Sequence, residues 1–582
     1  MALRQLTYIS WLAVIMVVVA CAGIEPSANA PASTSTEGVS QRGPERIMAA
    51  IRGAPRAFSQ LKDGTPSASI TGLRGLQELV HAGLVHADNR GNLHPQLAEA
   101  VPSIESGLWK LLPDGRMETT WRINRAARWH DGAPLTTDDL LFATTIEQDR
   151  DLGIPRNPVF DLIESVEAPD LQTIIVKWKQ PYIEADTLFT YEVALPLPRH
   201  LLESAYAGDK ASFLGIPYWS NEFVGAGPYK IREWVAESHV VLQSNELYVL
   251  GRPRIDEIEV RLIPDPNTLL ANLFAGVELT VDSGLSLEQW LQIQHEWTAR
   301  GGTVAHRAGG WIRVAPQFIN ANPPVVTDLR FRRAVLHAID RGEIGATLMG
   351  GLGGVAHSFV NPSTPEFEEI QGSIARYDYD PRRAVQMIEE VGYRRGSDGA
   401  FRDTAGERLS VEIRALDMDN PVHPKALAIV ADYWQQVGIA VEQVLVGRQR
   451  AGDAEYSATF PAFNLHHHAP TVATRGVIAF HGASAPLPEN RFVTRGNAAR
   501  YMNAELDALI DRYITTIARP ERVQLLGGIV HHMTDQVAIM GIVYSLAPTM
   551  IGSRLQNVTA SNASGSMRTT EGWNAHEWEL RS

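Results

Sequence analysis

The sequence has one cysteine, no excess of basic residues and no internal repeat. Cys21 is alone, so no disulfide can form within the chain and a folded body must be stabilised by its core. The net charge of −14 argues against a nucleic acid as partner, because phosphate binding needs clustered basic surface. Neither a repeat of roughly 20–50 residues nor a long run of heptads is present, which excludes solenoids and coiled coils.

Signatures of enzymes are also missing. There is no G-x-S-x-G elbow and no phosphate-binding P-loop. His295 and His576 each precede a glutamate but lack the second histidine of H-E-x-x-H. The glycine-rich segment 351–356 has neither the preceding strand nor the later acid of a dinucleotide turn, and we interpret it as a loop. We therefore expect no enzymatic activity and no cofactor.

The N-terminus has the pattern of an export signal. Residues 1–20 contain Arg4 and then an apolar run that is too short to span a bilayer, which needs roughly 20 residues. Small residues lead to Cys21, which resembles the cleavage and lipidation site of a bacterial lipoprotein. The alternative is an ordinary secretory signal with an incidental cysteine. Residues 21–46 are rich in Pro, Ala, Ser and Thr, and they predict a flexible linker to a membrane anchor outside the cytoplasm.

The rest of the chain predicts an α/β protein with at least two lobes. More than 500 residues remain, which is too long for one simple domain. Hydrophobic residues make up 45% of the whole chain, which is enough for a buried core. Alternation over 171–179 predicts a half-buried strand. Residues 411–415 predict a strand, Leu427–Val437 a helix that ends at Gly438, and a second strand starts at Ile439. Such a β-α-β unit places its two strands parallel.

Three further helix signals are specific. Thr136 with Asp139 resembles a capping box, after a tight turn at Asp131-Gly132. Asp380 followed by Pro381 predicts a helix start, with a stop at Gly392. Over 328–341 the apolar residues follow one helical stripe: Phe331, Ala334, Val335, Ala338 and Ile339.

Several segments, in this order, match motifs of one known family: Leu76–Leu84, Gly91–Glu99, Trp129–Phe142, Gly225–Lys230, Phe318–Asn320, Asp328–Arg341, Tyr377–Pro381 and Tyr501–Asp507. Each motif alone is weak, but together they cover most of the mature chain. The sequence resembles the extracytoplasmic solute-binding proteins of family 5, which serve peptide and nickel ABC importers. This resemblance implies a two-lobed periplasmic-binding-protein-like fold of type II (cluster C), with an extra subdomain in the first lobe.

The resemblance also implies a division of the chain. Lobe I would comprise 47–314, including the extra subdomain at about 100–220; lobe II would comprise 315–535, and 536–582 would return to lobe I. A ligand would lie between the lobes, which would close on a hinge. The expected function is that of a monomeric, lipid-anchored component of an ABC importer, which captures a peptide-like or other small polar solute and delivers it to permease subunits. The alternatives are a sensory receptor, a metal or metal-chelate binder, and a metal-dependent hydrolase.

The expected ligand residues follow from the resemblance. They are Ala82 and Gly83 at a first-lobe strand end, Trp311 where the chain crosses the cleft, His357 in the glycine-rich loop, and Phe463 with Asn464. The last two match a stretch in which many peptide binders carry an aspartate for the ligand's α-amino group. This sequence has no acid between Glu455 and Glu489, so the usual ammonium anchor is missing.

A histidine cluster, 466–468, follows this stretch. Imidazoles bind zinc, copper and nickel, but adjacent residues of a strand point to opposite faces, so at most His466 and His468 could share an ion. The other interpretation is a polar loop beside the cleft. We predict no metal site and keep His466 and His468 as the residues that would form one.

Overall fold

The computed structural model describes residues 44–581, except 56, 59–71, 153, 155–156, 283–284, 417–421, 469–470, 494–495 and 561–568. The predicted signal peptide, the lipidation site at Cys21 and nearly all of the predicted linker lie outside the described residues. The first strand already begins at Arg46, the last residue assigned to that linker. Among the described residues, no helix is both long and apolar enough to cross a membrane.

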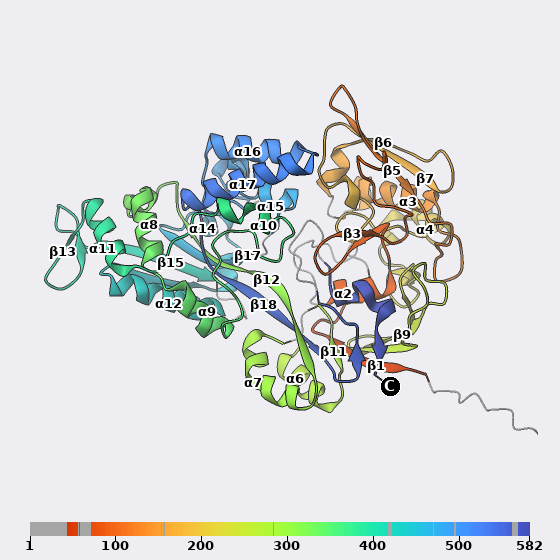
Figure 1. Ribbon diagram of the computed structural model, residues 1–582. Helices are drawn as coiled ribbons and strands as arrows, with labels where there is room; N and C mark the ends of the chain where they lie inside the picture. Colours follow the sequence, from red (N-terminus) through yellow and green to blue (C-terminus); the bar gives the residue numbers. More distant parts are fainter. Residues whose placement is uncertain are drawn as a thin grey trace, which may run out of the picture. The chain divides into compact units, whose positions relative to one another are not determined.

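One mixed sheet of ten strands organises the protein (Figure 1). In spatial order its strands are β16 (Ala440–Val446), β15 (Ser410–Leu416), β17 (Phe463–His468), β12 (Thr303–Pro316), β18 (Met540–Ile551), β11 (Leu279–Thr280), β1 (Arg46–Ile51), β10 (Glu257–Leu262), β9 (His239–Ser244) and β8 (Tyr229–Val235). Strands from the start, middle and end of the chain are therefore neighbours.

Two long antiparallel strands at the centre, β12 and β18, extend through both lobes. At one end, Thr303 pairs with Ile551 near β11 and β1; at the other, Val314 pairs with Met540 beside β17. The register shifts between Ala308 and Trp311, at the Gly309-Gly310 pair. The crossing points expected near 315 and 535 lie beside the second-lobe ends of these strands, while the domain limits themselves stay a prediction.

The first lobe contains a second, smaller sheet. It is four-stranded, in the order β4 (Trp109–Leu111), β5 (Met117–Arg122), β7 (Thr173–Trp178) and β6 (Ile163–Glu167), and it lies within the range of the expected extra subdomain. β7 buries alternate residues, as the pattern of 171–179 predicted. Helices α2 (Leu73–Val80), α3 (Thr137–Gln148) and α4 (Arg199–Gly208) complete this part of the fold.

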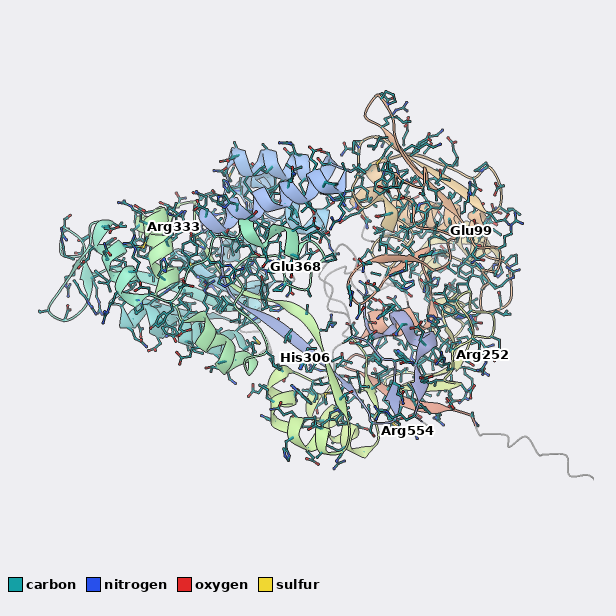
Figure 2. The ribbon with its side chains drawn as sticks, viewed as in Figure 1. Glu99, Arg252, His306, Arg333, Glu368 and Arg554 are labelled. Atoms are coloured by element: carbon teal, nitrogen blue, oxygen red, sulfur yellow. The ribbon has the colours of Figure 1, made fainter. Side chains whose placement is uncertain are left out.

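The helices of the second lobe cover both faces of its sheet. The core against one face includes residues of α8 (Leu329–His337), α9 (Arg341–Met349), α11 (Pro381–Glu390) and α12 (Val422–Gln436). The core against the other face includes residues of α15 (Thr474–Ile478), α16 (Ala504–Thr515) and α17 (Arg519–Asp535). Arg333 of α8, labelled in Figure 2, donates to the carboxylate of Asp535 at 2.7 Å and so ties α8 to the end of α17. Helices α6 (Pro266–Ala275) and α7 (Leu287–Ala299) precede β12.

Local signals in the sequence correspond closely to these elements. The capping box of Thr136 and Asp139 is present at the start of α3. Asp380 caps α11 through the N–H of Arg383, and Gly392 beyond its end has a φ of 115°. β15 and β16 are parallel and joined by α12, as the β-α-β pattern predicted. These three predictions are confirmed.

The single helical stripe expected over 328–341 is only partly correct. All five of its apolar residues are buried, but α8 ends at His337 and α9 begins at Arg341. Asp340 accepts the N–H of Glu343 and caps the second helix, while the carbonyl of His337 at the end of the first helix accepts the N–H of Asp380 at 2.9 Å.

Candidate ligand-binding site

In the first lobe, the glycine-rich turn 225–228 packs against the end of α2. A Cβ on Gly227 would lie 2.4 Å from the amide nitrogen of His81, so only glycine fits there. His130 holds the turn: its Nδ1 accepts the N–H of Gly225 at 3.1 Å, and its Nε2 lies 3.2 Å from the carbonyl oxygen of Gly227. Burial lowers the pKa of His130 to about 3, so the ring is neutral and its one proton belongs on Nε2. His130 therefore holds the turn 225–228 in place.

Ala82 and Gly83 follow α2 directly. The N–H of Leu84 donates to the carbonyl of Phe189 at 2.8 Å, and a Cβ on Gly83 would lie 2.8 Å from the same oxygen. The N–H of Gly83 donates to the side chain of Gln96 at 3.1 Å. These two expected ligand residues are thus covered by the segment around 189, and Ala82 is fully buried.

In the second lobe, one face of β17, β12 and β18 carries a row of polar and aromatic side chains. Residues directly opposite in antiparallel strands share a face. Trp311 is opposite both His468 and Tyr544, and Arg313 is opposite both His466 and Gly541. Their chain neighbours Ile312 and Val314 point the other way, into the core with α8 and α12.

The side chains of Phe463 and Asn464 lie on opposite faces of the sheet. Phe463 is fully buried, with its ring 4.7 Å from that of Trp434, in the core on the far face of the sheet. Asn464 is half-buried and opposite Ala315, in the row that contains Arg313. Of the two residues predicted here, only Asn464 lies on the same face as the polar row.

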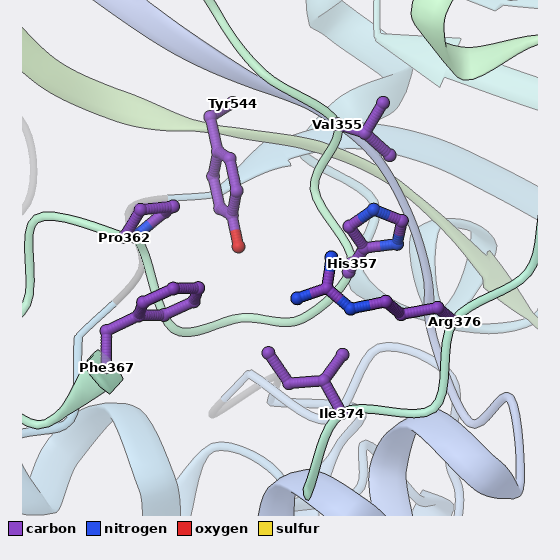
Figure 3. Close-up of a pocket in the computed structure, with 7 residues that line it drawn as sticks. All are labelled: Val355, His357, Pro362, Phe367, Ile374, Arg376 and Tyr544. Carbon is purple, nitrogen blue, oxygen red and sulfur yellow. The ribbon is translucent and has the colours of Figure 1, made fainter. Parts of the chain in front are cut away.

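A cavity of about 430 Å³ opens beside this row (Figure 3). Its lining consists of Val355, His357, Pro362, Phe367, Ile374, Arg376 and Tyr544. Residues 354–356 run along the free edge of β18, where the N–H of Tyr544 donates to the carbonyl of Gly354 and the N–H of Ala356 to that of Ile542. This edge pairing places the predicted residue His357 at the cavity.

The cavity has three polar side chains, those of His357, Arg376 and Tyr544, and among them only Arg376 is a cation near pH 7. Burial, together with the charges of Arg341 and Arg376, lowers the pKa of His357 to about 4, so this ring is neutral near pH 7. Arg376 is exposed, and its side chain has no hydrogen bond or ion pair with the residues that the structure describes. The Tyr544 hydroxyl lies 2.9 and 2.7 Å from the carbonyl oxygens of Ser358 and Val360. An apolar cavity with one unpaired cation suits a small organic molecule that carries negative charge.

One set of contacts between the lobes is made by the first-lobe segment 182–192. The carboxylate of Glu184 accepts the N–H of Thr474 at 2.9 Å, and that of Glu192 lies 3.2 Å from the guanidinium of Arg475. Burial raises the pKa of Glu184, and burial with the neighbouring Glu184 charge raises that of Asp186 to about 7. These contacts therefore involve carboxyl groups that are partly desolvated.

The histidine cluster gains no support as a metal centre. His466 lies on the same face as Arg313, and burial, together with the positive charge of Arg313, keeps the pKa of His466 well below its usual value. A guanidinium beside a ligand set repels a metal ion. Across the described part of the chain, no group of three or more metal-ligating side chains is found.

Comparisons with known proteins identify the architecture. The family model of bacterial extracellular solute-binding proteins, family 5, matches residues 92–474. The oligopeptide-binding protein AppA of Bacillus subtilis is 24% identical over 458 residues, which are 76% of this chain and 77% of that protein.

Solved structures agree on the fold. A periplasmic oligopeptide-binding protein of Thermotoga maritima superposes with a TM-score of 0.74 at 18% identity, over 92% of this chain and 99% of that one. NikA from Brucella suis, solved with Fe(III)-EDTA, gives 0.70 at 17% identity, over 92% and 100%. The fold is thus the expected two-lobed, type II architecture. The chain belongs to the bacterial extracellular solute-binding proteins of family 5, the substrate-binding components of ABC importers.

Proposed function

We propose that this protein is a lipid-anchored receptor that captures a peptide-like or other small polar organic solute between its lobes and delivers it to permease subunits. The observation that carries the proposal is the 430 Å³ cavity on the second-lobe sheet, which has apolar walls and the unpaired cation of Arg376. Capture, closure and docking involve no covalent step, and no group in this cavity forms a nucleophile–base pair.

The ligand set that we propose differs from the one expected from the sequence. His357, Arg376, Tyr544 and Asn464 are the second-lobe groups that a solute would meet. Trp311 is 2% exposed, so it supports the cavity wall beside Tyr544 and does not itself face solvent. Ala82 and Gly83 would reach a solute only through backbone atoms, because the segment around 189 covers them.

Peptides and metal chelates remain the two solute classes to compare. AppA is named for oligopeptide binding, and NikA was solved with an anionic chelate. The exposed guanidinium of Arg376 favours a solute with at least one carboxylate in either class, because a hydrogen bond between two charged groups is stronger than one between neutral groups.

Mass spectrometry of small molecules released from the denatured full-length protein, purified in detergent, tests the proposal. We expect a co-purified solute that is absent from an Arg376→Gln preparation, with an Arg122→Gln preparation as control, because Arg122 is an exposed arginine of the first-lobe sheet. A thermal-shift screen of tripeptides and Fe(III)-EDTA would then rank the classes. Equal recovery of the solute from Arg376→Gln would refute the role of this cavity. Turnover of a substrate would refute capture as the function.

A further inference from the structure

Arg313 is a buried cation without a partner. Its side chain is 1% exposed, and neither Nε nor Nη1 has a hydrogen-bond partner. Within the described residues no carboxylate pairs with it, and burial alone lowers the pKa of the guanidinium to about 9. The group is therefore still charged at pH 7. An unpaired buried charge costs several kcal/mol, so its presence needs a reason.

Two other buried arginines of the same lobe, Arg332 and Arg341, differ from Arg313 because their guanidinium groups are hydrogen-bonded. Arg332 is 3% exposed, and it donates to the carbonyls of Val326, Thr327, Gln536 and Val537 at 2.6–3.3 Å. Arg341 is 5% exposed, and it donates to the carbonyls of Gly541 and Tyr377 at 3.0 and 2.6 Å. Both guanidinium groups are thus bonded to backbone carbonyls of the fold, whereas that of Arg313 has no such bond to any described residue.

The surroundings of Arg313 contain further groups suited to an anion. His466, directly opposite on β17, has a buried Nε2 that also lacks a partner. This ring is neutral, so it can donate one N–H. The guanidinium carbon of Arg313 lies 5.6 Å from the ring centre of Trp311, which keeps the charge beside an aromatic surface.

We propose that Arg313 and His466 form the subsite for an anionic group of the captured solute, most simply a carboxylate. This proposal rests on the proposed function and narrows it: the solute must carry a negative oxygen group, and its recognition does not depend on an ammonium group. The polarity is the reverse of an acid that pairs with an α-amino group, which agrees with the lack of any acid between Glu455 and Glu489.

The burial of Arg313 defines when binding can occur. A side chain that is 1% exposed cannot receive a ligand unless the cover over this sheet face first opens. On this face Trp311 and Tyr544 pack with residues of α15, α16 and α17 of the second lobe, so this cover must move before an anion can replace water at the guanidinium. Pairing in the dry site would then favour the closed form, since a charged hydrogen bond gains strength when water leaves.

The first test needs no knowledge of the solute. Arg313→Met removes the charge and keeps most of the volume, and Arg332→Met is the matched control. In an anion-poor buffer we expect Arg313→Met to unfold about 2–4 °C above the wild type, because a buried unpaired charge is lost. Arg332→Met should unfold well below the wild type, because four carbonyl groups lose their donor. A fall of Arg313→Met to the level of Arg332→Met would overturn the proposal.

The second test uses defined anions. Sodium acetate, succinate and phosphate, each against sodium chloride at equal ionic strength, should raise the wild-type melting temperature and leave that of Arg313→Met unchanged. A shift of the melting temperature with acetate or succinate indicates a carboxylate site, and a shift with phosphate indicates a phosphate site. Succinamide should give no shift. Equal shifts in both proteins, or none in the wild type, would overturn the proposal.

The inference and the proposed function can fail separately. If the wild type releases a neutral solute on denaturation and its affinity for that solute is unchanged in Arg313→Met, capture stands and the anion subsite fails. If anions stabilise the wild type but not Arg313→Met, and no solute is ever captured, the anion subsite stands and the proposed capture function fails. For a solute with a carboxylate, we expect Arg313→Met to weaken binding about 30-fold or more, as loss of a buried charged pair does.

Discussion

Gly541→Ala offers the sharpest test of the packing beside the cavity. A Cβ at this position would lie 2.1 Å from the carbonyl oxygen of Ala356 and 2.9 Å from Cζ3 of Trp311, whereas ordinary contacts are 3.4–4 Å. The oxygen cannot rotate away, because the backbone of 354–356 is bonded to β18 at Ile542 and Tyr544. The edge segment must therefore move by over 1 Å.

The expected cost is at the upper end of that of overpacked cores, about 3 kcal/mol. Gly354→Ala is the matched control, since Gly354 is in the same segment and nothing lies within 4 Å of a Cβ there; its loss should be less than about 0.5 kcal/mol. Urea unfolding followed by tryptophan fluorescence measures both. Because the displaced segment leads to His357, Gly541→Ala should also weaken solute binding. Equal unfolding midpoints for the two variants would refute the close packing of Gly541 against Ala356.

Three further predictions concern other parts of the site. His130→Phe leaves the N–H of Gly225 without its acceptor and should lower the free energy of unfolding by about 1–3 kcal/mol in urea denaturation, whereas an unchanged midpoint would contradict the structural role of His130. Phe463→Ala should cost about 3–5 kcal/mol of stability without changing solute affinity, because the ring packs on Trp434; a selective loss of affinity would show that Phe463 meets the ligand. The third concerns pH: Asp186 has a pKa of about 7, above its usual 3.8, so its contribution to stability is fully present below about pH 4 and is lost as pH rises to about 7. The loss is at most about 4 kcal/mol, and Asp186→Asn should abolish it in unfolding curves between pH 4 and 8; parallel curves for the two proteins would contradict it.

Local patterns in the sequence were sufficient for much of the fold. The caps at Thr136 and Asp380 and the unit from β15 to β16 depend on bonds or periodicities within a short stretch, so they are readable without tertiary information. The break at Ala338–Asp340 could not be predicted, since the apolar stripe continues across it and the carbonyl of His337, at the end of α8, is bonded to the distant N–H of Asp380.

The site was less predictable because it depends on which face each side chain occupies. Phe463 and Asn464 are adjacent, and a shift of one residue reverses their faces. Arg376 and Tyr544 come from distant segments that meet only at the edge of β18, and no periodicity marks them. The sequence does contain a signal for Arg313. It is a charged residue between the apolar residues Ile312 and Val314, in a strand that is buried on both faces.

We propose that the paired strands β12 and β18 form the hinge between the lobes. A loop between lobes would swivel with little resistance, whereas here the connection is a hydrogen-bonded ribbon of 14 and 12 residues. The register of this ladder shifts twice, at Gly309-Gly310 and between Ile312 and Arg313, and we expect bending or twisting to deform the ribbon first at these shifts. The flexible part of the proposed hinge and the cation proposed to bind the solute are therefore on the same strand, β12. Substitutions at Gly309 and Gly310 should change the affinity for the solute although neither residue contacts it.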